Sequence, residues 1–224
     1  NSNTYSTNAR DVDAFLFDKK DAMVFISAGN DGADDDADQI PDLGSLGTPA
    51  TTKNGLAIGA SDAPNDQGNT VQGNQVNNRS FFSSVGPALG EDEVLDRTAP
   101  QLMAPGNEQG GGDMGMSSEY GCRSDDNDQD NPVECDIISA VEGTSFSAPA
   151  AAGAGALVRD YFAQGFYPDG TDTNPGYAGD QVPNISGALL KSMLIASAEY
   201  LPRNIQRAGG ANVTWPHRFN NEQG

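Results

Sequence analysis

The sequence predicts an α/β domain with a mostly parallel sheet flanked by helices. A periodic apolar pattern over residues 9–20 predicts a helix, and the largely apolar run at 22–27 predicts a buried strand directly after it. Strands without polar alternation are typical of parallel sheets that are covered on both faces. With 224 residues, of which 36% are hydrophobic, the chain is long enough to bury a full core.

The remaining strands are short apolar runs separated by long polar loops. Strands are expected at 55–59, 79–83, 102–105 and 137–141. Asn, Asp, Gln and Gly dominate the segments between them, which are interpreted as surface loops because these residues favour turns. The loops are expected at 32–42, 62–78 and 108–134, and the tail at 201–224 has little regular pattern.

Two helices are expected in the second half of the chain. The first covers 145–163, where Ala and Gly residues allow close packing against neighbours. The second covers 185–198, and its apolar spacing predicts a buried face made by Leu189, Leu190, Met193 and Leu194. No internal repeat and no linker divides the sequence, which predicts one domain over residues 1–224.

The charge balance excludes two classes of partner. Asp and Glu number 32 against 12 Lys and Arg, which gives a formal net charge of -20 and a sequence pI near 4.1. Such a chain lacks the basic patch that binds nucleic acid phosphates or an anionic membrane surface. No apolar run reaches the roughly 18 residues that a membrane-spanning helix needs.

The two cysteines are compatible with a disulfide. Cys122 and Cys135 enclose a polar, acidic loop, and a disulfide there would suit an exported protein. Two cysteines cannot complete a four-ligand zinc site, and the only histidine, His217, lies far along the chain. The sequence starts at Asn1 without an initiator Met or a signal peptide, so we expect it to be part of a longer chain.

A hydroxyl lies where a strand and loop lead into the helix predicted at 145–163. The segment GTSFSAP at 143–149 places Ser145 beside the unpaired N–H groups of the first helical turn, which favour developing negative charge. A nucleophilic serine benefits from this position because attack on a carbonyl creates an oxyanion. The alternative is that Thr144 or Ser145 only caps the helix.

A second polar side chain follows the strand predicted at 22–27. In SAGNDG at 27–32, the amide of Asn30 lies at the end of that strand, from where it can donate a hydrogen bond to an oxyanion. The alternative is that Asn30 only shapes a turn, since Asn-Asp-Gly is a common turn composition.

Together these segments resemble the subtilisin-like serine proteases. GTSFSAP is similar to the serine motif of that family, GTSMAxP, and SAGN at 27–30 is similar to the segment of its oxyanion asparagine. The resemblance runs from residue 11 to residue 198 and implies a three-layer subtilisin-like domain, incomplete here at its N-terminal side. Further similar segments follow the order of the family: GTPA at 47–50, LAIGA at 56–60, FSSVGP at 82–87, APQLMAPG at 99–106 and LLKSMLIASA at 189–198.

The resemblance implies a serine endopeptidase that forms an acyl-enzyme on Ser145. Asn30 and the backbone N–H of Ser145 would stabilise the oxyanion, and the substrate would be a peptide or protein. Phe146 stands where the family usually has Met. The residues that would line the pocket for the substrate side chain are Ala28, Gly29, Gly47 and Thr48.

The family's other two catalytic residues have no counterpart in the sequence. In the family an Asp and then a His precede the oxyanion asparagine, but only 29 residues precede Asn30 here. We therefore expect both on an upstream segment of the same protease, and the chain as given to be an inactive fragment. A different interpretation is an unrelated hydrolase fold that pairs Ser145 with His217.

Two acidic runs are candidate calcium sites. Carboxylates at alternate positions offer the oxygen ligands that Ca²⁺ prefers, although neither run matches an EF-hand loop. The alternative is a solvated acidic surface in a protein adapted to salt. The candidate ligands are Asp34, Asp36, Asp38 and Asp42 in the first run, and Asp126, Asp128 and Asp130 in the second.

Two classes of function follow. The first is a secreted or extracellular subtilisin-like endopeptidase with a possible structural calcium ion. The second is a catalytically inactive protease-like module that acts through calcium binding or its surface. An Asp-x-Gly segment and a His-Gly-Thr segment in the upstream reading frame would favour the enzyme, and their absence from a complete chain would favour the module.

Overall fold

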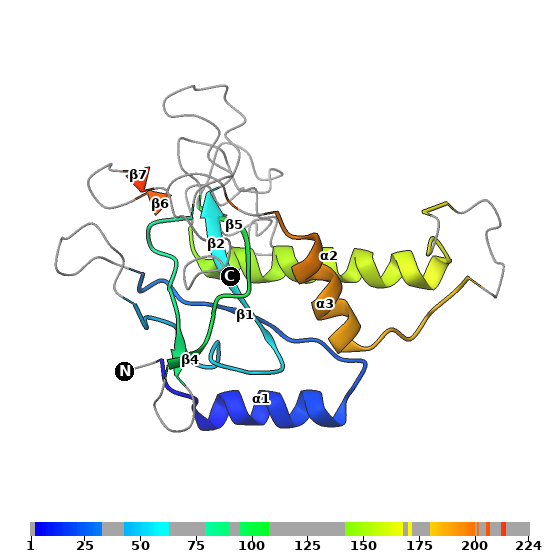
Figure 1. Ribbon diagram of the computed structural model, residues 1–224, viewed down its shortest axis with the longest axis horizontal. Helices are drawn as coiled ribbons and strands as arrows, with labels where there is room; N and C mark the ends of the chain where they lie inside the picture. The colour runs from blue at the N-terminus through cyan, green and yellow to red at the C-terminus, as the bar shows by residue number, and fades with distance from the viewer. Residues whose placement is uncertain are drawn as a thin grey trace, which may run out of the picture.

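The molecule is organised around a three-stranded parallel sheet. The computed structural model describes residues 3–32, 43–62, 79–89, 95–107, 142–167, 170–171, 180–199, 201, 205–206 and 212–213. The sheet has the strand order β1-β2-β5, and all its pairs are parallel (Figure 1). Its strands are β1 (Phe25–Ser27), β2 (Leu56–Asp62) and β5 (Leu102–Asn107).

Helices cover both faces of this sheet. Alternate side chains of β2 point to opposite faces, as strand geometry requires. Leu56 and Ile58 pack in the main core with α2 (Thr144–Gln164) and α3 (Gly187–Ser197). Ala57 belongs to a second cluster on the side of α1 (Thr7–Asp18). The predicted parallel sheet between helical layers is therefore confirmed (Figure 1).

The short strands differ from the sequence expectations. β3 (Ala88–Leu89) pairs with β4 (Leu95–Arg97), and β6 (Ile205–Gln206) with β7 (Asn212–Val213), each antiparallel. The last pair lies in the tail for which no regular pattern was expected. The strand expected at 79–83 is wrong, since only a single bridge joins Arg79 to Ser61. Here the Ser83 hydroxyl accepts the Ala60 N–H at 2.9 Å, which takes the place of a strand pairing.

Side-chain caps start two of the helices. The Ser6 hydroxyl accepts the Ala9 N–H at 3.2 Å at the start of α1, and Ser186 accepts the Leu189 N–H at 3.1 Å at the start of α3. The face expected for α3 is half wrong. Leu190 and Leu194 are buried, but Leu189 and Met193 are 39% and 38% exposed because each lies one position, about 100° of helix rotation, from the buried stripe.

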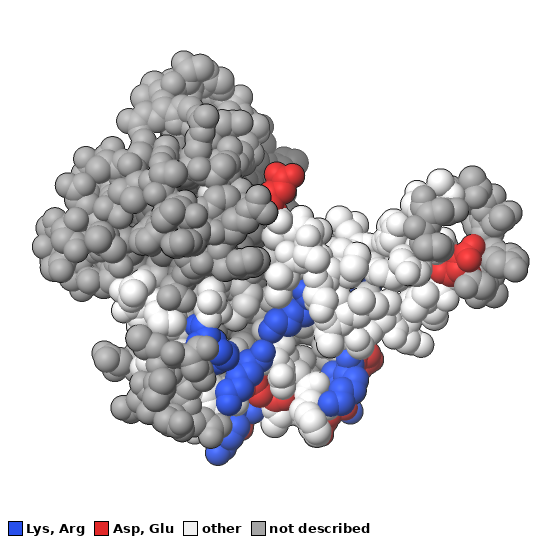
Figure 2. Space-filling model, in the orientation of Figure 1, with Lys and Arg blue, Asp and Glu red and all other residues white. Residues whose placement is uncertain are grey.

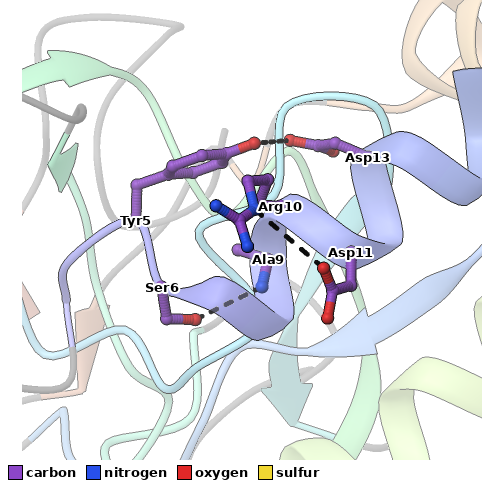
Figure 3. Close-up of polar contacts among 6 residues, drawn as sticks. All are labelled: Tyr5, Ser6, Ala9, Arg10, Asp11 and Asp13. Atoms are coloured by element: carbon purple, nitrogen blue, oxygen red, sulfur yellow. Dashed lines mark hydrogen bonds and ion pairs between the residues drawn. The ribbon is translucent and has the colours of Figure 1, made fainter.

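Asp13 anchors α1 to the turn before β2. Asp13 is only 7% exposed, and its carboxylate accepts hydrogen bonds from the Thr52 hydroxyl, from the Asn54 N–H at 2.8 Å and from the Lys53 N–H at 3.0 Å. Tyr5 Oη adds a fourth donor at 2.7 Å (Figure 3). Burial by itself would raise the pKa of Asp13, but these hydrogen bonds together hold the pKa below its usual 3.8.

Lys191 joins α3 to the same turn. Its Nζ donates to the carbonyl oxygens of Gly55 at 2.7 Å and Lys53 at 3.1 Å. Burial and the nearby Arg97 guanidinium lower the pKa of Lys191, and the Asp13 carboxylate opposes that shift. Two helices from opposite faces of the sheet are thus fixed to one short turn.

The described surface does not carry the strong acidic excess of the whole chain. In the view of Figure 2, Lys and Arg side chains gather in the lower half, in the region of α1, and much of the surface over α2 is uncharged. The acidic runs at 33–42 and 108–141 lie outside the described residues. Among the described residues, none of the helices is both long and apolar enough to cross a membrane.

Candidate active site

Asn30 follows the carboxyl end of β1 in a tightly held turn. The Ala28 N–H donates to the Ile58 carbonyl at 2.9 Å, which continues the sheet, and Gly29 then turns with φ at +113°. A Cβ at Gly29 would lie 2.7 Å from Ser84 Oγ, so only glycine fits both the backbone conformation and the space. The turn presents the side chain of Asn30 at the surface.

Ser145 is the second residue of α2, and it is exposed. The residue that caps the helix is Gly143, which has no side chain to hydrogen-bond with the first turn. The alternative in which Thr144 or Ser145 caps the helix is therefore wrong. Among the described residues, the Ser145 hydroxyl has no hydrogen-bond partner.

The structure brings Asn30 and Ser145 together through Thr144. Asn30 Oδ1 accepts both the backbone N–H and the hydroxyl of Thr144, each at 2.9 Å. A Cβ placed on Gly143 would lie 3.2 Å from Asn30 Nδ2 and 3.7 Å from the backbone nitrogen of Ser145. Both nitrogens therefore lie within 4 Å of one point, next to the exposed serine.

β5 fixes the turn that leads into α2. The Gly143 N–H donates to the Gly106 carbonyl at 2.8 Å, at the carboxyl end of β5. A Cβ at Gly106 would lie 2.1 Å from Ser147 Oγ and 2.8 Å from the Gly143 carbonyl oxygen. The strand end and the helix start therefore approach so closely that Gly106 has to lack a side chain.

The residues expected to line a substrate pocket lie in two adjacent segments. The Gly47 N–H donates to the Ala28 carbonyl at 2.7 Å, and a Cβ at Gly47 would lie 3.8 Å from Gly29 Cα. Ala28 as a whole residue is fully buried in a cluster with Leu46, so it presents no exposed surface to a ligand here, unlike the expectation that it lines the pocket. Thr48 is exposed, and its hydroxyl pairs with that of Ser6.

Sequence reasoning missed three neighbours of Asn30 and Ser145. Thr144 holds the amide, Ser84 accepts the Asp31 N–H at 3.0 Å, and Gly106 gives α2 room to start. From the sequence alone, Thr144 is a candidate only for the helix cap. The signal in the sequence is that Thr144 directly precedes Ser145 in the segment GTSFSAP.

Several expected features lie outside the described residues. These are His217, the cysteines Cys122 and Cys135, the strand at 137–141, and both candidate calcium runs, namely Asp34, Asp36, Asp38 and Asp42 in the first and Asp126, Asp128 and Asp130 in the second. Within the described part of the chain, no group of three or more His, Cys, Asp or Glu side chains is arranged to hold a metal ion.

The solved structures that match this chain include three proteases. A protease from Pseudoalteromonas arctica is 16% identical, with a TM-score of 0.47, and the match covers 89% of this chain and 42% of that one. Sphericase is 19% identical, with a TM-score of 0.43 and coverages of 88% and 44%. The self-cleaved protease domain of PatA is 21% identical, with a TM-score of 0.37 and coverages of 67% and 37%.

This chain therefore spans less than half the length of each of these three proteins. A search of curated proteins gave no match. The family model described as the Subtilase family matches residues 1–219, nearly the whole sequence. The chain, with its α/β subtilisin-like fold, belongs to the subtilase family.

Proposed function

We propose that residues 1–224 form the part of a serine endopeptidase domain that carries the nucleophile and the oxyanion-binding amide. Ser145 Oγ attacks the carbonyl carbon of a peptide bond while a base takes its proton. The tetrahedral intermediate collapses, the base returns the proton to the leaving amine, and an ester on Ser145 remains. Water then hydrolyses this acyl-enzyme and regenerates the serine.

One observation carries this proposal. Asn30 Nδ2 and the Ser145 backbone nitrogen both lie within 4 Å of the position that a Cβ on Gly143 would take, next to the exposed Ser145. First-turn N–H groups have no partner within their helix, so the Ser145 N–H is available to an oxyanion. In serine proteases of this kind, one such donor is worth roughly 10²–10³ in kcat.

The base is proposed to lie on a segment upstream of residue 1. Within the described residues, the Ser145 hydroxyl has no partner, and a serine without an adjacent base is a weak nucleophile. We propose that the upstream segment supplies the His that takes the proton and the Asp that orients that His. The chain alone then retains only the contribution of the oxyanion-binding groups, on the order of 10³–10⁴ over water.

The substrate side chain is proposed to contact the two adjacent segments around Gly29 and Gly47. Gly29 and Gly47 are both half-buried, so part of their backbone surface remains open to an extended peptide. The Gly47 N–H donates a hydrogen bond to the Ala28 carbonyl, which joins the two segments. Thr48, directly after Gly47, is exposed.

A fluorophosphonate probe tests the proposal directly. The probe reacts with an activated serine, so we expect Ser145 to be labelled in the full-length protease, hardly in this chain alone, and not in Ser145→Ala. Asn30→Ala should slow labelling of the full-length protein roughly a hundredfold. Equal, rapid labelling of both proteins would place a base within residues 1–224, and labelling that survives Ser145→Ala would refute the assigned nucleophile.

A second candidate function is an inactive protease-like module that binds calcium or a protein partner. The observation that favours it is the lack of a partner for the Ser145 hydroxyl among the described residues. The full-length protein would then fail to react with the probe although it is folded, and its upstream sequence would lack the Asp and His.

Calcium, a disulfide and secretion complete the proposal. The acidic run from Asp34 to Asp42 lies between the segments of Asn30 and Gly47, so a cation bound there would order that edge of the site. A bond between Cys122 and Cys135 would fit an exported protein. Intact mass measurement with and without reductant tests the disulfide, because its formation removes two hydrogens.

A further inference from the structure

The turn before β2 contains the only Asn-Gly pair among the 224 residues, Asn54 and Gly55. In such a pair the backbone nitrogen of the glycine can attack the side-chain amide carbon of the asparagine, because glycine has no side chain to shield its nitrogen. The side-chain nitrogen then leaves as ammonia. Asn54 is exposed, so water has access to the reacting groups. The turn therefore carries the groups that deamidation requires.

The fold requires both members of this pair. Gly55 is buried, and a Cβ there would lie 2.8 Å from Thr52 Cγ2 and 3.3 Å from the carbonyl oxygen of Val24. The Asn54 N–H donates to Asp13 Oδ1 at 2.8 Å, and its Nδ2 donates to the Asp13 carbonyl oxygen at 3.0 Å. Exchange of either residue costs packing or hydrogen bonds, so the labile pair belongs to the native structure.

The nitrogen that would attack is already engaged. The Gly55 N–H donates to Thr52 Oγ1 at 3.1 Å, and the Thr52 hydroxyl in turn donates to the Asp13 carboxylate. Because the carboxylate takes the hydroxyl hydrogen, a lone pair of Oγ1 is left for the glycine. Attack requires that the nitrogen lose its proton and approach the side-chain carbon, and this hydrogen bond opposes both. Thr52 is fully buried, so packing fixes its position.

The groups around that nitrogen are held as well. The nitrogen that would leave, Asn54 Nδ2, is bound by the end of α1 at Asp13. The Gly55 carbonyl accepts Lys191 Nζ from α3 at 2.7 Å, and the Leu56 N–H donates to the carbonyl that precedes β1 at 3.0 Å. The peptide groups of the turn can therefore rotate only when the turn opens locally, and such opening has its own free-energy cost.

We propose that the Asn54-Gly55 pair is a latent modification site, protected by the fold and reactive when the turn opens. In the open turn the Gly55 nitrogen bonds to Asn54 Cγ, its proton passes by way of water to the departing nitrogen, and ammonia leaves a cyclic succinimide. Water then opens the ring at either carbonyl and gives aspartate or isoaspartate at position 54. The net reaction takes up water and releases ammonia, with no change of oxidation state.

The product does not fit the native turn. A carboxylate in place of the amide cannot donate to the Asp13 carbonyl, and it brings a second negative charge to the Asp13 carboxylate. Isoaspartate also lengthens the backbone by a methylene just before β2, where Leu56 pairs with Phe25. A molecule that has opened at this turn is thus marked irreversibly. The inference goes beyond the proposed function and does not depend on it.

The test follows deamidation by mass spectrometry in the full-length protein carrying Ser145→Ala, so that self-digestion cannot interfere. This parent is incubated at neutral pH, folded and in guanidinium chloride, and we expect the folded protein to react roughly tenfold more slowly or less. Thr52→Val keeps the branched shape without the hydroxyl and should speed the folded-state reaction roughly five- to tenfold. Thr52→Ser keeps the hydroxyl and should react like the parent.

Two controls separate opening of the turn from other effects. Phe162→Leu leaves a cavity in the main core on α2, and its rate is compared with that of Thr52→Val equally far below the Tm of each variant. Asn54→Asp imitates one product and should lower Tm by roughly 2–5 °C. Asn184→Asp adds the same charge at another exposed asparagine and should leave Tm unchanged.

Each opposing result overturns the proposal. Equal rates in the folded and the denatured parent, or no reaction in either, would show that the fold protects no labile pair. A Thr52→Val variant that reacts no faster than the parent or than Phe162→Leu would show that the turn does not control the reaction. An unchanged Tm in Asn54→Asp would remove the irreversible mark. A failed fluorophosphonate test beside the expected deamidation rates would count against the proposed function alone.

Discussion

Removing the carboxylate of Asp13 tests how α1 is held to the sheet. In Asp13→Ala, the fully buried Thr52 hydroxyl loses its acceptor, and an unsatisfied buried donor costs about 1–3 kcal/mol. Lys53 and Asn54 are exposed, so water can replace the bonds that their N–H groups made. With the lost charge-assisted bonds included, we expect a loss of about 3 kcal/mol in the free energy of unfolding.

The matching assay is urea unfolding at neutral and acid pH. About 3 kcal/mol corresponds to a fall of about 6–12 °C in Tm for a chain of this size. The Asp11→Asn variant is a matched control on the same helix. Asp11 is exposed, and within the described part of the chain its one ion pair is with Arg10 at 4.0 Å, so its loss should change stability by less than about 0.5 kcal/mol (Figure 3).

The pH dependence of this effect has a definite sign. Because the folded pKa of Asp13 lies below the 3.8 of the unfolded chain, the ionised carboxylate stabilises the fold fully above that value. The contribution is lost as the pH falls below 3.8 and through the lower folded pKa. The isosteric Asp13→Asn variant should therefore differ from the native protein by about 1–2 kcal/mol at pH 7 and by less in acid. A difference that is the same at pH 7 and pH 3 would refute the reasoning.

Three further predictions concern the start of α2 and the acidic run at 34–42. Gly106→Ala should prevent correct packing, since its Cβ would lie 2.8 Å from the Gly143 carbonyl oxygen; normal expression and an unchanged Tm would contradict this. Ser147→Ala should raise Tm by about 2–4 °C, because Ser147 Oγ is buried and has no hydrogen-bond partner among the residues that the structure describes; a lower Tm would show that the hydroxyl has a partner. Chelation with EDTA should lower Tm if calcium binds the acidic run, and an unchanged melting curve would remove that idea.

The sequence was sufficient to predict the architecture, because the apolar periodicity of the segments and their order along the chain indicate which of them are helices and which are strands. The helix expected at 145–163 is found as Thr144–Gln164, and the strand expected at 102–105 as Leu102–Asn107. The strand at 22–27 begins later, at Phe25, because its partner β2 begins at Leu56 and the two pair in register from there. Boundaries of this kind depend on neighbours that no local pattern reveals.

The polar anchors were beyond sequence reasoning for a different reason. Asp13 and Thr52 meet across 39 residues, and neither belongs to a motif. The available signal was an acidic side chain beside Val12 and three positions before Leu16, on the face of α1 that packs on the sheet. Its four donors come from the preceding loop and from the turn before β2, so their convergence exists only in three dimensions.

The bonds between Asn30 and Thr144 span 114 residues. A contact of such separation closes only after the sheet between its partners has formed, since the entropy of closing a long loop opposes it until then. A nascent chain that has not yet emerged as far as α2 lacks both the hydrogen bonds from Thr144 to the Asn30 amide and the helix that carries Ser145. The proposed reactive geometry of Asn30 and Ser145 therefore requires that the chain has been synthesised as far as α2 and that this helix has packed on the sheet.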